Sequence, residues 1–166
     1  MSGEITTIIR PFRLGEERYV IESHYDFYRR EHQYDLSFKR FVEEGVRQFV
    51  LSFEPGNDQL WVIEKGERLK GSIAIQRIAA AEARLRWFLI DPELAGQGYG
   101  KRLLELATLF CRDSGCETIV LETGSKLVRA RELYSKSGFV LLESKEQILS
   151  NQLLVTEHWR KDLKLG

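Results

Sequence analysis

The spacing of apolar residues divides the chain into short alternating runs, which are typical of strands, and longer runs with helical periodicity. Residues 5–12 alternate apolar side chains with Thr and Arg and are predicted to form a strand. Two helices are expected next, the first over about 15–30 and the second beginning at an Asp35 N-cap. The predicted apolar stripe of the second helix comprises Phe38, Phe41, Val42, Val46, Phe49 and Val50. The Pro-Gly-Asn-Asp sequence at 55–58 ends this first part of the chain.

The rest of the chain alternates strands with helices. The predicted strands cover 60–64, 69–76, 84–90, 118–123, 139–144 and 153–163, and the predicted helices cover 99–114 and 126–137. The first two of these strands are joined as a hairpin at Gly66, and Gly138 ends the last helix. The order β-α-α-β-β-β-α-β-α-β-β predicts an α/β fold in which a mixed sheet carries helices on both faces.

Composition narrows the function classes. With 166 residues, residues 1–166 are predicted to be a single domain with a sizeable core. A net charge of zero argues against a nucleic-acid partner. No apolar run approaches the roughly 20 residues of a membrane span, and the polar start at 1–4 is unlike a signal peptide, so no membrane partner is expected. Cys111 and Cys116 match no zinc pattern and are expected to be buried free thiols, which favours the cytoplasm and no metal site.

One segment, residues 91–104 (DPELAGQGYGKRLL), places three alternating glycines at the start of a predicted helix. Glycine has no Cβ, so the backbone can approach a ligand, and the free N–H groups of a first helical turn favour a phosphate. A dinucleotide-binding fingerprint does not fit, because Lys101 stands where its last glycine is required. A Walker A loop does not fit either, because Arg102 stands where Ser or Thr is required. On the glycines alone, a helix start without a ligand is an equal alternative.

The same segment resembles the acetyl-CoA motif of the GNAT N-acetyltransferase superfamily, whose core is [RQ]-x-x-G-x-G/A. Residues 130–139 (ARELYSKSGF) resemble the second motif of that family, A-x-x-L-Y-x-x-x-G-F, and the resemblance extends over roughly 5–163. Within the superfamily, the chain is most similar to the acetyltransferase domain that often follows a MarR-type winged-helix regulator. The similar parts are Arg10-Pro11 with Gly15-Glu16, residues 24–28 and residues 85–88. No DNA-binding domain is expected with it here.

The resemblance implies a sheet that is splayed after the central strand, with acetyl-pantetheine in the gap and the pyrophosphate on the glycines. The implied acetyl-CoA-binding residues are Phe88, Leu89 and Ile90 on the strand and Ala95, Gly96, Gln97, Gly98, Tyr99, Gly100 and Lys101 at the helix start. Two positions depart from the family. Ala95 stands where Arg or Gln is usual, and Leu127 stands where many members have asparagine. Because N–H groups make most of a phosphate site, we expect weaker binding at most from Ala95.

The resemblance also implies direct transfer of an acetyl group from acetyl-CoA to a primary amine. Tyr134 matches the family's tyrosine and is expected to be the general acid, the alternative being a core aromatic residue. The identity of the general base is left open, because Arg84 stands where many members have glutamate. Glu82 and Glu122 are the candidates, and solvated carboxylates are the alternative for both.

His24 and Tyr28 lie on the first helix, which in this family often forms part of the acceptor pocket. A histidine on an apolar helix face is more often a core residue, so His24 carries that alternative. The expected partner is a small-molecule or peptide amine of unknown identity, and a homodimer through an edge strand is left open. The alternative function is a non-catalytic acyl-CoA-binding sensor or regulatory module, suggested by Arg84, Ala95 and Leu127. A DNA-associated regulator is a third hypothesis, which no basic patch in the sequence supports.

Overall fold

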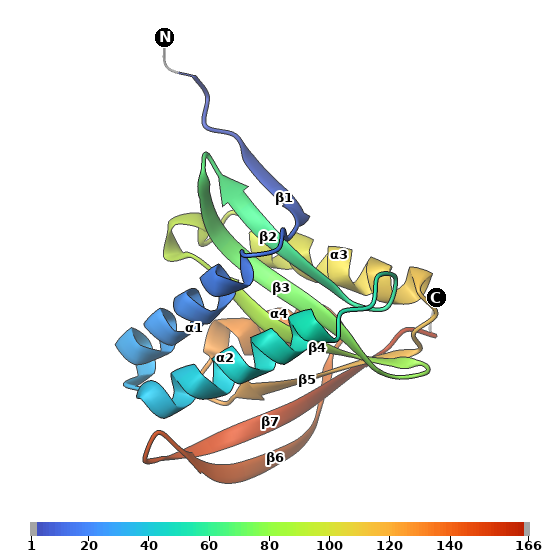
Figure 1. Cartoon of the computed structure of the whole chain (residues 1–166). Coiled ribbons are helices and arrows are strands. Elements are labelled where there is room, and N and C mark those ends of the chain that lie inside the picture. The colour runs from blue at the N-terminus through green and yellow to red at the C-terminus, as the bar shows by residue number, and fades with distance from the viewer. Residues whose placement is uncertain (1–2, 165–166) are drawn as a thin grey trace.

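A mixed seven-stranded sheet with helices against both faces forms the body of the protein (Figure 1). The computed structural model describes residues 3–164. The elements are β1 (Thr7–Pro11), α1 (Glu17–His32), α2 (Leu36–Leu51), β2 (Gln59–Lys65), β3 (Arg68–Ala79), β4 (Glu82–Ile90), a 3-10 turn η1 (Pro92–Leu94), α3 (Tyr99–Asp113), β5 (Thr118–Gly124), α4 (Val128–Lys136), β6 (Val140–Leu149) and β7 (Gln152–Asp162). The α/β fold class and the order of elements predicted from the sequence are confirmed.

The sheet is splayed between β4 and β5. The strand order is β1-β2-β3-β4-β5-β7-β6, and β4 with β5 is the parallel pair. These two strands pair only over Glu82–Arg84 and Thr118–Val120. Beyond that point β4 continues along β3 to Ile90, while β5 continues along β7 to Gly124, so the two halves of the sheet diverge. The edge of β4 that faces the gap therefore keeps free main-chain groups.

A β-bulge lies on β4 at the start of this gap. Trp87 has φ +47°, and the register between β3 and β4 shifts between Ser72 and Ala74. The shift leaves Trp87 and Phe88 together opposite Ile73. A bulge bends its strand and increases the local twist, which fits its place where β4 leaves β5.

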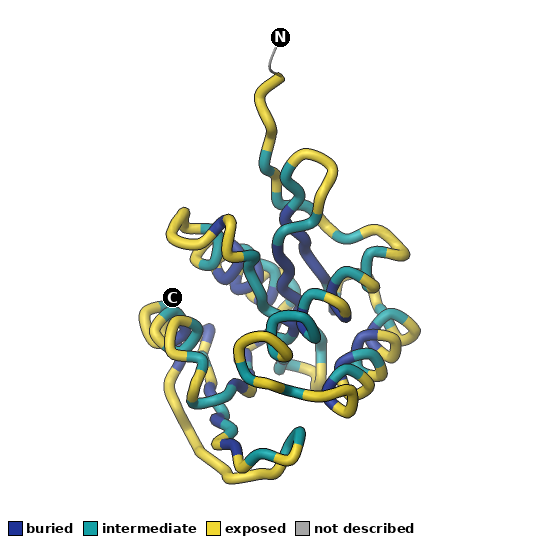
Figure 2. The backbone as a smooth tube through the Cα atoms, turned by 90° about the vertical axis from the view of Figure 1, so that its left-hand side faces the viewer, coloured by how far each residue is buried: buried dark blue, intermediate teal, exposed yellow. Residues whose placement is uncertain are grey.

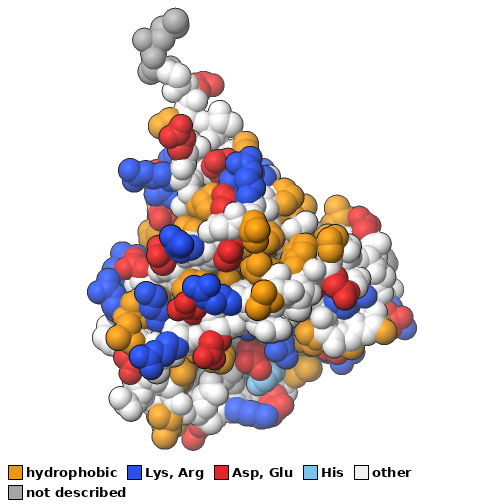
Figure 3. Space-filling view, viewed as in Figure 1, with side chains coloured by type: hydrophobic (Ala, Val, Ile, Leu, Met, Phe, Trp, Pro, Cys, Tyr) orange, Lys and Arg blue, Asp and Glu red, His pale blue; other side chains and the backbone are white. Residues whose placement is uncertain are grey.

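Two apolar clusters hold the helices on the two faces. α1 and α2 pack with Trp87 in one cluster, whereas α3 and α4 pack with β2–β5 in the other. Buried residues accordingly concentrate in the central strands and on the inner sides of the helices (Figure 2). On the outer face, over α1 and α2, acidic and basic side chains are intermixed (Figure 3). No helix within residues 3–164 is long and apolar enough to cross a membrane.

Three details of the sequence prediction are corrected. Phe41 is 61% exposed, because the buried stripe of α2 is the narrower set of Phe38, Val42, Val46 and Phe49. The strand β6 is longer than predicted and forms one hairpin with β7 that turns at Ser150 and Asn151. The turn before α3 contains η1, which the Asp-Pro sequence did not reveal. The Asp35 N-cap is confirmed, since its side chain accepts a 2.9 Å hydrogen bond from the Ser37 N–H.

Candidate active site

The backbone before α3 forms a cradle of main-chain N–H groups. Gly96 and Gly98 have φ of +75° and +84°, a conformation that residues with a Cβ rarely adopt. A Cβ on either residue would meet nothing within 4 Å, so open space lies in front of the backbone. Gly98 is the N-cap of α3 and provides no side-chain cap. The first hydrogen bond of the helix runs from the Arg102 N–H to the Gly98 carbonyl oxygen. The preceding N–H groups are therefore available to an anion at the positive end of the helix dipole.

Gly100 has a different role. A Cβ there would lie 2.8 Å from Leu133 Cδ2, 3.4 Å from Ile90 Cδ1 and 3.5 Å from Phe88 Cζ. This glycine allows the first turn of α3 to pack closely against α4 and β4. The sequence pattern suggested that all three glycines make room for a ligand, but only Gly96 and Gly98 face open space.

The turn that leads from β4 to α3 is braced by charges. Lys65 and Lys70 donate to the Glu93 carboxylate at 2.7 and 2.9 Å. These hydrogen bonds lower the pKa of Glu93 to about 2. The Gln97 side chain in turn donates to the Glu93 carbonyl at 3.0 Å. The position of the N–H cradle is thereby tied to β2 and β3.

Tyr134 lies on the buried side of α4, beside the gap in the sheet. It is 5% exposed, and its ring centroid lies 6.1 Å from that of Phe88 and 5.8 Å from that of Phe139. Burial raises the pKa of Tyr134, with a smaller contribution from Tyr28, so the hydroxyl keeps its proton at neutral pH. Within residues 3–164 this hydroxyl has no hydrogen-bond partner, so it is free to donate to a bound molecule.

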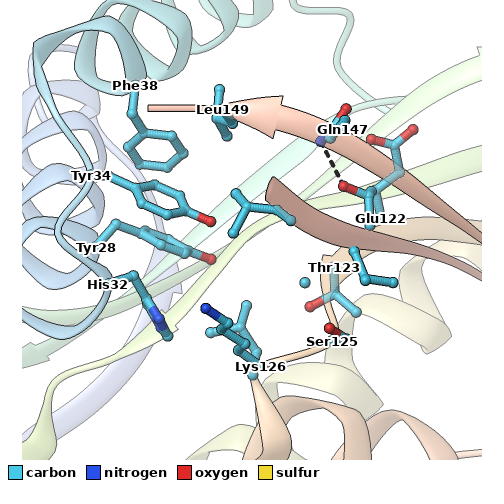
Figure 4. A pocket seen from close by; sticks show the side chains of 15 residues that line it. Tyr28, His32, Tyr34, Phe38, Glu122, Thr123, Ser125, Lys126, Gln147 and Leu149 are labelled. Atoms are coloured by element: carbon cyan, nitrogen blue, oxygen red, sulfur yellow. Dashed lines mark hydrogen bonds between the residues drawn. The ribbon is translucent and has the colours of Figure 1, made fainter. Parts of the chain in front are cut away.

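A cavity of about 160 Å³ opens between α1, α2, the end of β5 and the β6–β7 hairpin (Figure 4). We call it the aromatic cavity. It is lined by Tyr28, His32, Tyr34, Phe38, Glu122, Thr123, Gly124, Ser125, Lys126, Leu127, Gln147, Leu149, Leu154, Val155 and Thr156. Tyr28, which lines this cavity, also contributes to the raised pKa of Tyr134, after burial.

The residues expected to be base or acceptor contacts fall in different places. Glu122 lines the aromatic cavity, its side chain is 53% exposed, and its Oε1 lies 3.5 Å from His158 Nδ1. Glu82 begins β4 opposite Thr118, at the paired end of β4 and β5, and the structure does not bring it to the cavity.

Of the two helix residues, Tyr28 lines the cavity and His24 does not. His24 is 5% exposed, and its Nδ1 lies 2.8 Å from the Val20 carbonyl oxygen. Burial lowers the pKa of His24 to about 4, so the ring is neutral at physiological pH. This geometry corresponds to the alternative of a core histidine.

Sequence reasoning missed Tyr34 and Lys126 and counted Phe38 only as core. Tyr34 lies between α1 and α2 and stacks on Tyr28 with ring centroids 5.3 Å apart. Lys126 lies between β5 and α4. Lys126 is far in sequence from the two aromatic residues, and no local spacing connects it with them.

Comparisons with known proteins agree with this geometry. The sequence model of the acetyltransferase (GNAT) family matches residues 19–139, which is well over half of the chain. The protein belongs to the GNAT acetyltransferase family. For the described residues of this GNAT protein, no group of three His, Cys, Asp or Glu side chains that could hold a metal ion is found.

Among curated relatives, human N-acetyltransferase 8 is 32% identical over 84 residues, which are 48% of this chain and 37% of that protein. Rat N-acetyltransferase family 8 member 2 is 29% identical over 103 residues, 59% of this chain and 46% of that protein. The matched part is less than half the length of each relative.

Solved structures share the fold over nearly the whole GNAT chain. A GNAT-family acetyltransferase from Staphylococcus aureus Mu50 has a TM-score of 0.77 and 20% identity, with 96% of this chain and 100% of that chain covered. An acetyltransferase from Salmonella typhimurium, solved with its cofactor acetyl-CoA, has a TM-score of 0.73 and 14% identity, with 96% and 95% covered.

Proposed function

We propose that the protein is an N-acetyltransferase that moves an acetyl group from acetyl-CoA directly to a primary amine. The observation that carries the proposal is the cradle of N–H groups around Gly96 and Gly98, which opens beside the gap where Tyr134 lies. The curated relatives are named as N-acetyltransferases, and the Salmonella structure holds acetyl-CoA, which supports the same cofactor here.

The residues present fit this cofactor. The main-chain N–H groups of residues 96–101, on the open side of Gly96 and Gly98, would hold the pyrophosphate. The free edge of β4 at Phe88, Leu89 and Ile90 would hold the amides of the pantetheine arm, as a strand edge holds another strand. Ala95 does not disturb this arrangement, because its N–H already donates to the Pro92 carbonyl at 3.1 Å and the cradle begins after it.

Acetyl-CoA, when bound, supplies a thioester whose carbonyl carbon bonds to the amine nitrogen as its carbon–sulfur bond breaks and the electron pair leaves with sulfur. Tyr134 holds a proton at its hydroxyl, free of other partners, and can donate it to that sulfur. Glu122 is the carboxylate that lines the cavity and can accept the proton that the amine loses, directly or through water. Solvent returns one proton to Tyr134 and takes one from Glu122, so an amide and a thiol are the products.

Two measurements test the proposal. Isothermal titration calorimetry with acetyl-CoA and with CoA should give binding heat and a rise in melting temperature. A thiol-release screen over amino acids, dipeptides, polyamines and aminoglycosides should then give turnover with at least one amine. Absence of both heat and thermal shift would overturn the proposal.

A non-catalytic acyl-CoA sensor is the second candidate, and Arg84 is the observation that favours it. This arginine replaces the usual glutamate of the family, and among the described residues its Nε is buried without a hydrogen-bond partner. A sensor would bind CoA but release no thiol with any amine, so the same screen separates the two functions. The likeness of the chain to acetyltransferase domains that follow MarR-type regulators is likewise a proposal, beyond membership of the GNAT family. The cytoplasm remains the expected compartment, in keeping with free, buried Cys111 and Cys116.

A further inference from the structure

Three hydrogen-bond donors converge in the aromatic cavity. The hydroxyls of Tyr28 on α1 and of Tyr34 in the turn before α2 point into it, and the ammonium of Lys126 points toward them from the β5–α4 loop (Figure 4). Burial raises the pKa of both tyrosines, so their hydroxyls keep their protons. Lys126 is exposed and forms no ion pair with a carboxylate within residues 3–164. The pKa of His32 is lowered mainly by burial of the imidazole, and Lys126 adds to this effect whereas Glu31 opposes it. Two hydroxyls and one unpaired ammonium form a site for a carboxylate.

One part of the cavity wall is apolar, whereas Thr123, Ser125, Gln147 and Thr156 make another part polar. Phe38, Leu127, Leu149 and Leu154 line the apolar part, and the Tyr28 and Phe38 rings lie with centroids 4.8 Å apart. The volume is about 160 Å³. Since a cavity of about 150 Å³ accommodates a benzene ring, this cavity has room for one aromatic or branched aliphatic side chain.

The cation beside the tyrosine hydroxyls acts against a polycation. Lys126 lines the cavity on this side, and Glu122 is the carboxylate of the lining. A polyamine would bring several positive charges to this environment, whereas an amino acid brings its own carboxylate.

We propose that the acceptor is an α-amino acid with an apolar, preferentially aromatic side chain, whose carboxylate binds Tyr28, Tyr34 and Lys126. This inference rests on the proposed acetyltransferase function. The side chain packs against Phe38, Leu149 and Leu154. Because the amine of an α-amino acid lies one carbon from its carboxylate, a carboxylate bound by Tyr28 keeps the amine inside the cavity that Glu122, the candidate base, also lines.

The first test compares acceptors in the thiol-release assay. L-Phenylalanine should be acetylated with a kcat/KM about 10-fold or more above that of phenethylamine, which has the same ring and amine but no carboxylate. Spermidine should be poorer than both. Equal or better turnover of phenethylamine or spermidine would overturn the inference.

The second test removes the cation. In Lys126→Met, which keeps the length of the side chain, the kcat/KM for L-phenylalanine should fall about 10- to 100-fold, mainly through KM, as expected for a lost charged hydrogen bond. The value for phenethylamine should stay within about 2-fold of the original, since that amine makes no such bond. Lys136→Met, on the last turn of α4 and outside the cavity, is the matched control and should change neither value. An equal loss for both amines in Lys126→Met would contradict a carboxylate contact.

The outcomes separate this inference from the function on which it rests. Acetylation of spermidine but of no amino acid would overturn the inference and leave the acetyltransferase intact. Binding of acetyl-CoA without turnover of any amine would overturn the inference and favour the sensor. No binding of acetyl-CoA in calorimetry would overturn the inference and the proposed function together.

Discussion

Ser72 Oγ donates a 2.8 Å hydrogen bond to the carbonyl oxygen of Trp87, at the bulge where β4 leaves β5. Trp87 has φ +47°, and a residue held in this region costs about 1–3 kcal/mol. Ser72 is fully buried, so water does not replace its hydroxyl as the donor to the Trp87 carbonyl oxygen. The bond compensates for part of the strain and fixes the direction of β4 along the gap in the sheet.

Ser72→Ala should therefore lower both stability and cofactor affinity. The substitution leaves a buried carbonyl without its donor, which costs about 1–3 kcal/mol. The free energy of unfolding, measured in urea, should fall by that amount, and acetyl-CoA affinity in calorimetry should fall with it. Ser144→Ala on the exposed strand β6 is the control. An unchanged affinity in a destabilised Ser72→Ala protein would separate the bulge from cofactor binding.

Gly98→Ala tests the cradle. Alanine at φ +84° is strained by about 1–2 kcal/mol although no atom lies in the way. Relief of that strain would turn the N–H groups away from the pyrophosphate, so acetyl-CoA affinity should fall about 10-fold or more.

Gly15→Ala is its matched control, because Gly15 has φ +102° and also meets nothing within 4 Å. It lies before α1, on the opposite face of the sheet from α3. Both variants should lose similar stability, and only Gly98→Ala should lose affinity. A similar loss of affinity in both would attribute the effect to general destabilisation.

Local patterns in the sequence were sufficient for the order of the elements and for the glycine-rich turn that precedes α3. The strand–turn–helix order around Gly96 and Gly98 depends on residues near each other in the chain, so spacing alone predicted it. Phe41 was placed wrongly because periodicity gives an apolar face but not how much of it the sheet covers.

The aromatic cavity depends on contacts between distant segments. Tyr34, Lys126 and Leu154 meet there only because the helices, the β5–α4 loop and the β6–β7 hairpin converge. The conformation of Trp87 also depends on a distant segment. Its positive φ accompanies a register shift against β3, and the strand propensity of tryptophan does not indicate such a shift.

Tyr134→Phe tests the proton donor. Loss of the hydroxyl should lower turnover by about 100-fold or more while the affinity for acetyl-CoA changes little, because the ring keeps its packing. Since burial raises the pKa of Tyr134, the original protein should show no loss of turnover from this group between pH 7 and pH 9, roughly the range below the ordinary tyrosine pKa.

Tyr19→Phe is the control for this substitution, because Tyr19 is another tyrosine packed against an apolar cluster, with its pKa raised to about 12 by burial, but it does not line the cavity. Its turnover should match that of the original protein. If Tyr134→Phe retained full turnover, Tyr134 would be a packing residue and another group would protonate the thiolate.

His24 should make the protein sensitive to mild acid. Burial lowers its pKa to about 4 from the ordinary value of 6.5, so the unfolded chain binds a proton that the folded protein does not bind between these values. The contribution of His24 to stability is complete above about pH 6.5 and is lost as the pH falls toward 4, by on the order of 3 kcal/mol in all. Chemical denaturation at pH 7.0 and pH 5.0 measures the difference.

His24→Leu keeps a side chain of similar size and removes the titration, so its stability should change less between these two pH values. The hydrogen bond to Val20 is lost in this variant, which lowers its stability at both pH values and cancels in the comparison. Glu16 and Glu93 also have lowered pKa values, through their Arg and Lys partners, but they titrate below about pH 4.5 and are present in both proteins. If the original protein and His24→Leu lost equal stability between pH 7.0 and pH 5.0, the buried imidazole would not be the group that takes up the proton.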